Sequence, residues 1–172
     1  MLNLFQHLTT LSISVMEYHE EFEDGVFLGS GFLENGKKTG KWSYFYETGE
    51  LKNEIEYQDG IENGSFKLFH KNGQIAIECQ HLNGSNVGVW KEYYESGQLQ
   101  EVIEYINGEG FTLDFWDEDG THLLKNGTGK KIVRYGGLFN DVWEQYFDKK
   151  QFIRETKISG AKFISFTPKG QE

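Results

Sequence analysis

The sequence has little of three things that restrict a fold: cysteine, proline and long apolar stretches. Cys79 is the one cysteine among 172 residues, so no internal disulfide can form, and no set of cysteines and histidines has zinc-site spacing. Pro168 is the one proline, which argues against a proline-rich linker. No apolar run reaches the roughly 18 residues that indicate a transmembrane helix. We therefore expect no metal, no cofactor and no membrane span.

The N-terminal residues also lack the features of a targeting signal. They begin without a cationic group and contain no sustained apolar core, so we expect no signal peptide. A single free cysteine suits a reducing compartment. Together these observations predict a cytoplasmic location.

Positive charge is scarce in the first two thirds of the chain. The net charge is −10, but residues 1–120 contain 7 basic and 22 acidic side chains, whereas residues 121–172 contain 10 and 5. Nucleic acids and anionic lipids are bound by clustered Lys and Arg, so we expect neither as a partner. This charge favours a basic protein as the partner, although solubility alone also explains such asymmetry.

Glycine, in contrast, is abundant and regularly spaced. Gly49, Gly73 and Gly97 lie 24 residues apart. Glycines that follow Asn or Asp keep the same interval, at Gly36, Gly60, Gly84 and Gly108. The stretch that begins at Gly40 recurs at Gly64 and Gly88 with aromatic residues in matching places. Such self-similarity is the signature of a repeat array.

Within each repeat, apolar residues alternate with polar ones, as in a half-buried strand. A two-residue turn ending in Gly49 would place Trp42 opposite Ile55 and Tyr46 opposite Leu51, with all four on one face. The sequence therefore predicts an all-β fold, a repeat array of about 24-residue antiparallel β-hairpins that forms a long twisted meander sheet.

The array is expected to extend over residues 17–160. Residues 1–16 would form an N-terminal cap and residues 161–172 a C-terminal cap or tail, because terminal repeats need atypical ends. One period before Trp42 stands Tyr18, which we assign to a degenerate first repeat. The period breaks at about 117–130, where we expect an insertion loop. Lys150 replaces the turn glycine of the last unit, which predicts a turn of another shape.

The repeated pattern Gly-x-Trp-x-x-Tyr-Tyr-x-x-Gly-x-Leu, followed by a tyrosine and an Asn-Gly turn, resembles the variant MORN repeat. The whole chain resembles bacterial proteins of the YwqK type, a family described as the antitoxins of toxin–antitoxin pairs. The resemblance covers about residues 17–160 and includes the interruption after Phe115. It implies a hairpin scaffold that binds, and in the antitoxin case neutralises, another protein.

Two groups of residues could carry chemistry. Cys79 and His81 would share one face of a strand, as a nucleophile and its base do, but they replace Ile55 and Tyr57 of the preceding repeat and so fill apolar positions. An acidic cluster offers oxygen ligands for calcium, at Asp114, Asp117, Glu118 and Asp119. It lacks the spacing of a calcium loop and coincides with a turn. We expect no catalytic residue and no metal site.

One aromatic residue recurs four positions before each turn glycine, on the face that is otherwise polar. These residues, which we call the ring row, are Phe45, Phe69, Tyr93 and Trp116. The acids expected on the same face are Glu54, Glu56, Glu78 and Glu104. Exposed rings flanked by charge are typical of an interaction surface, so these eight are the predicted partner-binding residues. In the other interpretation, terminal segments cover the ring row of a two-sided sheet.

The sequence favours a non-catalytic repeat protein that mediates protein–protein interaction, with antitoxin-like neutralisation of a partner as its specific form. The alternative is a structural array for self-assembly or membrane-associated scaffolding, in which the chain is a monomer or self-associates weakly through its sheet edges. An enzyme has the least support. A neighbouring toxic gene would indicate the first function, and a concentration-dependent size in solution the second.

Overall fold

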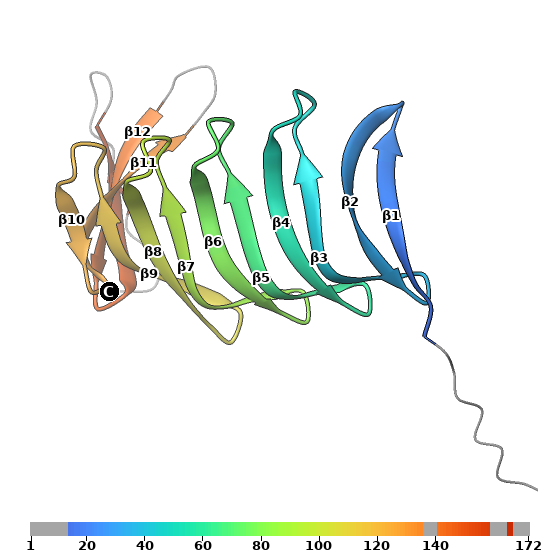
Figure 1. Cartoon of the computed structure of the whole chain (residues 1–172). Helices are drawn as coiled ribbons and strands as arrows, with labels where there is room; N and C mark the ends of the chain where they lie inside the picture. The colour runs from blue at the N-terminus through green and yellow to red at the C-terminus, as the bar shows by residue number, and fades with distance from the viewer. Residues whose placement is uncertain (1–13, 136–140, 159–164, 167–172) are drawn as a thin grey trace, which may run out of the picture.

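The computed structural model describes residues 14–135, 141–158 and 165–166. Within these ranges the chain forms fourteen strands and no helix, and the strands lie in one sheet in the order in which they follow along the chain. Figure 1 shows them as a curved row of antiparallel hairpins. The predicted all-β meander is confirmed. Residues 1–13 of the predicted cap, and the predicted tail apart from residues 165–166, lie outside the described residues.

The strands follow one another at short intervals. They are β1 (Met16–Glu23), β2 (Val26–Glu34), β3 (Lys37–Phe45), β4 (Leu51–Gln58), β5 (Ile61–Phe69), β6 (Ile75–Leu82), β7 (Ser85–Tyr93), β8 (Leu99–Ile106), β9 (Glu109–Trp116), β10 (His122–Lys125), β11 (Thr128–Tyr135), β12 (Asp141–Asp148), β13 (Gln151–Lys157) and β14 (Ser165–Phe166).

The Asn-Gly and Asp-Gly pairs form two-residue turns. Between β4 and β5, Gln58 lies opposite Ile61, and the two turn residues Asp59 and Gly60 have φ of 53° and 83°. Positive φ at both central residues defines the tight turn that matches the twist of a hairpin. Asn tolerates this conformation better than most residues, which explains its recurrence before the glycine.

The other turn of each repeat differs from the expectation. The Tyr46 N–H donates to the carbonyl of Glu50, and the Gly49 N–H to the carbonyl of Tyr46, each over 2.8 Å. Three residues therefore form the loop, and Gly49 closes it with φ of 95°. The predicted two-residue turn is wrong. A turn ending in a left-handed glycine is the common three-residue hairpin connection.

The register nevertheless agrees with the prediction further from the turn. Phe45 lies opposite Leu51, but Tyr44 lies opposite Asn53, so one extra residue is accommodated on β4. This bulge reverses the shift that the longer turn introduces, and Trp42 lies opposite Ile55 as expected. Leu51 is the exception, because it shares a face with Phe45 rather than with Tyr46.

The glycine two residues before each central aromatic also lies in a bulge. The partners of β4 on β5 shift by two residues between Tyr57 and Ile55, where Gly64 has φ of 125°. The Ser65 N–H next to it donates to the carboxylate of Glu56 over 2.8 Å. The glycine of the Gly-x-Trp pattern is thus needed for a backbone conformation that other residues rarely adopt.

The apolar interior lies mainly on one face of the sheet, which we call the tryptophan face. Trp42 is fully buried there, with Ile55 and Cys79 at 6% exposure each. Its indole packs on the backbone of Gly31, where an added Cβ would come within 2.5 Å of the ring. The ring N–H donates to the carbonyl of Phe32 over 3.0 Å.

The β1–β2 and β12–β13 hairpins have two-residue turns in place of the three-residue turn. Glu23 lies opposite Val26, so His19 rather than Tyr18 faces Gly31, the position equivalent to Ile55. The prediction that Tyr18 takes the place of Trp42 is therefore wrong, and Tyr18 points to the opposite face. In the β12–β13 hairpin Lys149 and Lys150 form a two-residue turn with φ of 48° and 71°. The predicted change of turn shape at Lys150 is confirmed.

The break in the period is part of the sheet. The structure places β10 (His122–Lys125) and the start of β11 (Thr128–Tyr135) within the predicted insertion loop at about 117–130. Leu124 is fully buried and lies opposite Phe115, which is 1% exposed. Burial of these two side chains explains why the segment pairs with β9 instead of forming a free loop.

Candidate functional site

The predicted ring row lies on the face opposite the tryptophan face, which we call the ring face. Cross-strand partners share a face, and Phe45, Phe69 and Tyr93 pair with Leu51, Ile75 and Leu99. Each ring therefore packs beside an aliphatic partner and is half-buried rather than exposed. Trp116 stacks on His122 with ring centres 4.3 Å apart.

A repeating hydrogen bond fixes the backbone beneath the ring row. The Tyr46 hydroxyl donates to the carbonyl of Phe69 over 2.8 Å, and the Tyr94 hydroxyl to that of Trp116 over 2.9 Å. His70 takes the same role, with Nε2 2.8 Å from the carbonyl of Tyr93. The carbonyl accepts, so this nitrogen carries the proton. Each bond joins one repeat to the next.

The four predicted acids lie on the ring face, but each already has a partner. Glu54 pairs with Lys41, and Glu104 with Lys150 over 2.6 Å. Glu56 accepts from the Ser65 backbone, as described above. These contacts neutralise much of the negative charge that the sequence assigned to this surface.

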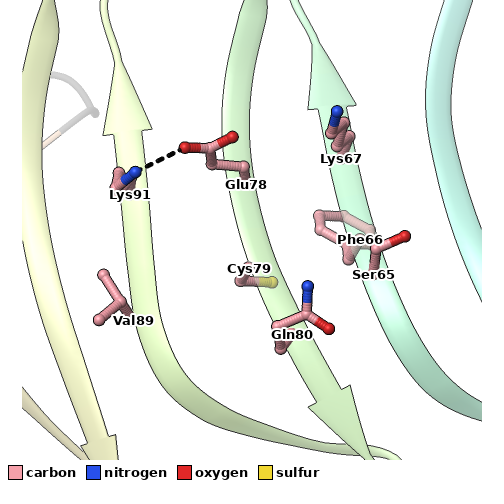
Figure 2. Close-up of a pocket in the computed structure, with 8 residues that line it drawn as sticks. All are labelled: Ser65, Phe66, Lys67, Glu78, Cys79, Gln80, Val89 and Lys91. Carbon is pink, nitrogen blue, oxygen red and sulfur yellow. Dashed lines mark hydrogen bonds and ion pairs between the residues drawn. The ribbon is translucent and has the colours of Figure 1, made fainter.

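Glu78 is the most highly connected of these acids. It lies 2.9 Å from Lys91, as Figure 2 shows, and also accepts from the Tyr93 hydroxyl over 2.8 Å. Hydrogen bonds from Lys91 and then Tyr93 hold the pKa of Glu78 below its usual range. The ring row and the acids are thus brought together at one point, where Tyr93 contacts Glu78.

A shallow hollow lies beside this contact. Its volume is about 210 Å³. Six of its lining residues lie on the ring face, and Phe66 and Cys79 belong to the tryptophan face. The lining consists of Ser65, Phe66, Lys67, Glu78, Cys79, Gln80, Val89 and Lys91. Pockets for small-molecule ligands are usually about 300–1,000 Å³. The hollow beside Glu78 is thus small for a substrate.

A second apolar row on the ring face was missed by the sequence analysis. Ile61, Leu82 and Ile106 stand beside the two-residue turns, with exposures of 50%, 55% and 46%. Register places them on the ring face, because each follows or precedes a residue of the tryptophan face. Leu82 and Ile106 are 24 residues apart, but Gln58 holds their position in the preceding repeat, and Ile61 lies on the other side of its turn, so the repeat comparison did not reveal a row.

The comparisons with known proteins agree with this geometry. Residues 38–59, 62–83 and 86–107 each match the family model of the MORN repeat variant. Three segments of the chain are therefore similar to the MORN repeat variant. No curated protein matches the chain.

Each matched segment begins in β3, β5 or β7 and includes one three-residue turn. The MORN pattern therefore corresponds to a hairpin whose glycines serve the bulge and the turn. In the part of the chain that the structure describes, no helix is long and apolar enough to span a membrane. No group of three or more His, Cys, Asp or Glu residues could hold a metal ion there.

Cys79, His81 and Glu62 form a short polar chain within the second matched segment, residues 62–83. The Cys79 Sγ lies 3.9 Å from His81 Nε2, and His81 Nδ1 lies 3.1 Å from a Glu62 oxygen. The order resembles a thiol, base and orienting acid. Burial raises the pKa of the Cys79 thiol to about 11, and Glu62 acts in the same direction. A protonated thiol is a poor nucleophile, so this geometry supports a packing role.

The predicted acidic cluster forms turn contacts. Asp114 lies 2.9 Å from His122 Nε2, and Asp119 accepts from the Thr121 backbone N–H over 2.9 Å. Asp117 accepts from the N–H of Glu118 over 2.8 Å. These bonds occupy the carboxylates within the chain and support the turn interpretation over a calcium loop.

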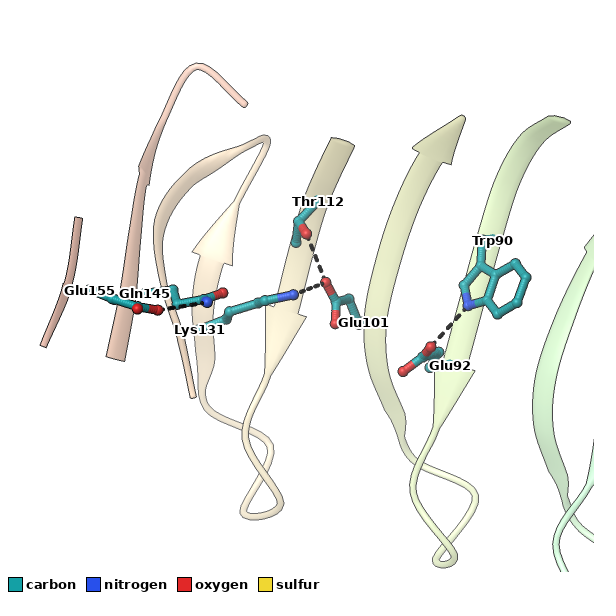
Figure 3. A network of polar contacts seen from close by, with 7 residues as sticks. All are labelled: Trp90, Glu92, Glu101, Thr112, Lys131, Gln145 and Glu155. Carbon is teal, nitrogen blue, oxygen red and sulfur yellow. Dashed lines mark hydrogen bonds and ion pairs between the residues drawn. The ribbon is translucent and has the colours of Figure 1, made fainter. Parts of the chain in front are cut away.

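A polar network on the tryptophan face joins the MORN repeats to the C-terminal strands (Figure 3). Glu101, at 6% exposure, accepts from the Thr112 hydroxyl over 2.7 Å and from Lys131 Nζ over 2.8 Å. A buried carboxylate needs such partners, since burial of an unpaired charge is costly. The network holds β8, β9 and β11 together.

Proposed function

We propose that the chain is a non-catalytic repeat protein whose ring face binds another protein. The observation that carries the proposal is the pair of apolar rows on this face. The half-buried ring row runs beside the three-residue turns, and exposed Ile61, Leu82 and Ile106 run beside the two-residue turns. Flat apolar area with little side-chain entropy is the usual source of binding energy.

The charges between the two rows would determine the approach and alignment of the partner. Glu54, Lys67, Glu78 and Lys91 alternate in sign across neighbouring strands. Because the acids are already paired, they contribute to the rate of encounter more than to retention of the partner. The net charge of −10 favours a basic partner at long range.

The specific form that we propose is neutralisation of a toxin. This step rests on the resemblance to antitoxins of the YwqK type, because the hairpin scaffold alone does not define a partner. The protein encoded by the neighbouring gene is therefore the first partner to test. The physical requirement is that it presents basic residues around an apolar patch.

The test is a binding series with that neighbouring protein. Tyr93→Ala should weaken the complex by about 2 kcal/mol, whereas Tyr93→Phe, which keeps the ring, should weaken it by less than about 1 kcal/mol. Urea unfolding of each variant separates binding from stability. If Tyr93→Ala unfolds the chain without a selective loss of affinity, the ring row is core and the proposal fails. An unchanged affinity in a folded Tyr93→Ala variant would refute it equally.

A further inference from the structure

The outer edge of β1 is one of the two open edges of the described sheet. β1 pairs with β2 and with no other described strand. The extra residue of this hairpin lies on β2, because Glu21 faces Gly29 while Phe22 faces Phe27. β1 itself therefore runs unbroken for 8 residues. An unpaired row of N–H and C=O groups of this length can accept another strand.

The charge pairs between neighbouring repeats indicate which charge a strand added beside β1 would face. Across the inner junctions of the array, Glu54 lies directly opposite Lys67, and Glu78 opposite Lys91. Glu20 occupies the position of these lysines on β1. It follows His19, which faces Gly31, as Lys67 follows Phe66 and Lys91 follows Trp90. The edge strand therefore has a glutamate where the inner repeats have a lysine. Glu20 therefore lacks at the edge the opposite charge that Glu54 and Glu78 each face at the inner junctions.

The remaining charges on β1 have the same sign. The first 36 residues contain no Lys or Arg, and Glu21 is paired with Lys38 of β3 over 2.8 Å. Among the described residues, Glu17, Glu20 and Glu23 have no cationic partner and are exposed. In contrast, each of the four acids predicted for partner binding on the ring face already has a partner. The edge therefore retains uncompensated negative charge beside open backbone groups.

The side chains of β1 alternate in chemistry as well. Glu17, Glu21 and Glu23 lie on the tryptophan face, while Tyr18 and Phe22 lie on the ring face at 59% and 58% exposure. Phe22 is one strand removed from the ring row, since its cross-strand partner Phe27 contacts Phe45 at 5.4 Å between ring centres. An added strand with cations on the tryptophan face and apolar residues on the ring face would complement both patterns.

We propose that the edge of β1 docks an extended segment of a partner protein in which cationic residues alternate with apolar ones. Its cations would face the unpaired Glu17 and Glu23, its apolar residues would pack on Tyr18 and Phe22, and its backbone would pair with β1. A second copy of β1 fits poorly, because its own glutamates would crowd against these. Tyr18 and Phe22 share the ring face, but the edge lies beyond the ring row and is separate from the binding site proposed there.

The probe is a synthetic peptide of about nine residues in which lysine alternates with valine and threonine. It should bind the full chain, measured by fluorescence anisotropy, and bound peptide should slow hydrogen exchange of β1 amides at least tenfold. The same peptide N-methylated at alternate residues keeps its charge but lacks backbone donors. Equal binding of both peptides would show that only charge is recognised and would overturn strand addition.

Charge reversal at the edge tests the position. Glu17→Lys with Glu23→Lys should weaken peptide binding roughly tenfold or more. The matched control, Glu47→Lys with Glu95→Lys, changes net charge equally at exposed turn residues and should leave binding within about twofold. Tyr93→Ala, which tests the ring face, should also leave it unchanged. Equal loss in the edge and control variants would overturn the proposal.

Self-association provides the last test. Sedimentation of the chain across a range of concentrations should give a monomer, because the acidic edge disfavours pairing with itself. A dimer that the Glu17→Lys and Glu23→Lys variant abolishes would mean that a second copy occupies the edge, and would overturn the assignment to a basic partner.

Discussion

The hydroxyl of Tyr46 donates to the backbone carbonyl of Phe69, across the junction between two repeats, over 2.8 Å. His70 makes the equivalent contact from its ring to Tyr93. The residue three positions before each turn glycine thus carries a donor that joins neighbouring hairpins. This position therefore requires a side-chain donor that reaches the carbonyl, and either a tyrosine hydroxyl or a histidine ring nitrogen can supply it.

His70→Tyr should therefore preserve stability, and His70→Phe should reduce the free energy of unfolding by about 1 kcal/mol, the usual contribution of such a bond. Both substitutions keep an aromatic ring, so the difference isolates the donor. Urea unfolding monitored by circular dichroism measures it. Equal stability of the two variants would mean that the bond contributes nothing.

The close contact between Gly31 and Trp42 predicts a steric effect. Gly31→Ala would place a methyl group within 2.5 Å of the indole, and such overpacking costs about 1–3 kcal/mol. Gly36→Ala is the control, because its site is open and its φ is 77°. Its cost should be the backbone strain alone, about 1 kcal/mol. Thermal unfolding of both variants should show the larger loss at Gly31.

The geometry of Cys79 predicts slow reaction with alkylating reagents. Burial, with the Glu62 charge as a second cause, raises the pKa of its thiol from 9.0 to about 11, which lowers the thiolate fraction at neutral pH about 100-fold. Because the chain has one cysteine, iodoacetamide labelling followed by mass spectrometry reports this site alone. The native chain should react at least about 100-fold more slowly than the chain in urea. Comparable rates would contradict the buried, protonated state.

Much of the fold follows from the sequence because its determinants are local. The 24-residue spacing of glycine and the alternation around Trp42 and Ile55 are enough to give strands, hairpins and the register of the central pairs. The error at the turn near Gly49 had a specific cause. The three-residue turn shifts the register by one residue, and the bulge in the following strand shifts it back. Trp42 therefore lies opposite Ile55, as it would with a two-residue turn and no bulge.

The site was harder to predict because it depends on which residues pair across the sheet. Sequence spacing placed the ring row and Glu78 on one face, but did not reveal that Lys91 and Tyr93 already occupy the carboxylate. Tyr18 lies on the ring face because the turn between β1 and β2 is one residue shorter than the turn near Gly49. The contact between Lys131 and Glu101 joins residues 30 apart across a break in the period, where the repeat offers no guide.

The last prediction concerns Tyr94 at alkaline pH. Burial, followed by the charges of Asp117 and Glu118, raises the pKa of Tyr94 to about 12. In the unfolded chain a tyrosine loses its proton near pH 10, so between about pH 10 and 12 the folded chain holds a proton that the unfolded chain has lost. The unfolding free energy therefore falls with rising pH across this window.

Tyr94→Phe should lower stability at neutral pH, because the bond to the Trp116 carbonyl is lost, yet make the decline between pH 10 and 12 shallower than in the parent chain. Urea unfolding at a series of pH values measures both effects. Glu118→Gln separates the causes, since removing this charge should lower the pKa of Tyr94 only slightly if burial dominates. Because the chain has nine tyrosines, the difference between the phenolate absorbance titrations of matched chains with and without Tyr94→Phe isolates that pKa. Identical slopes for the parent and Tyr94→Phe would show that Tyr94 ionises alike in the folded and unfolded chains.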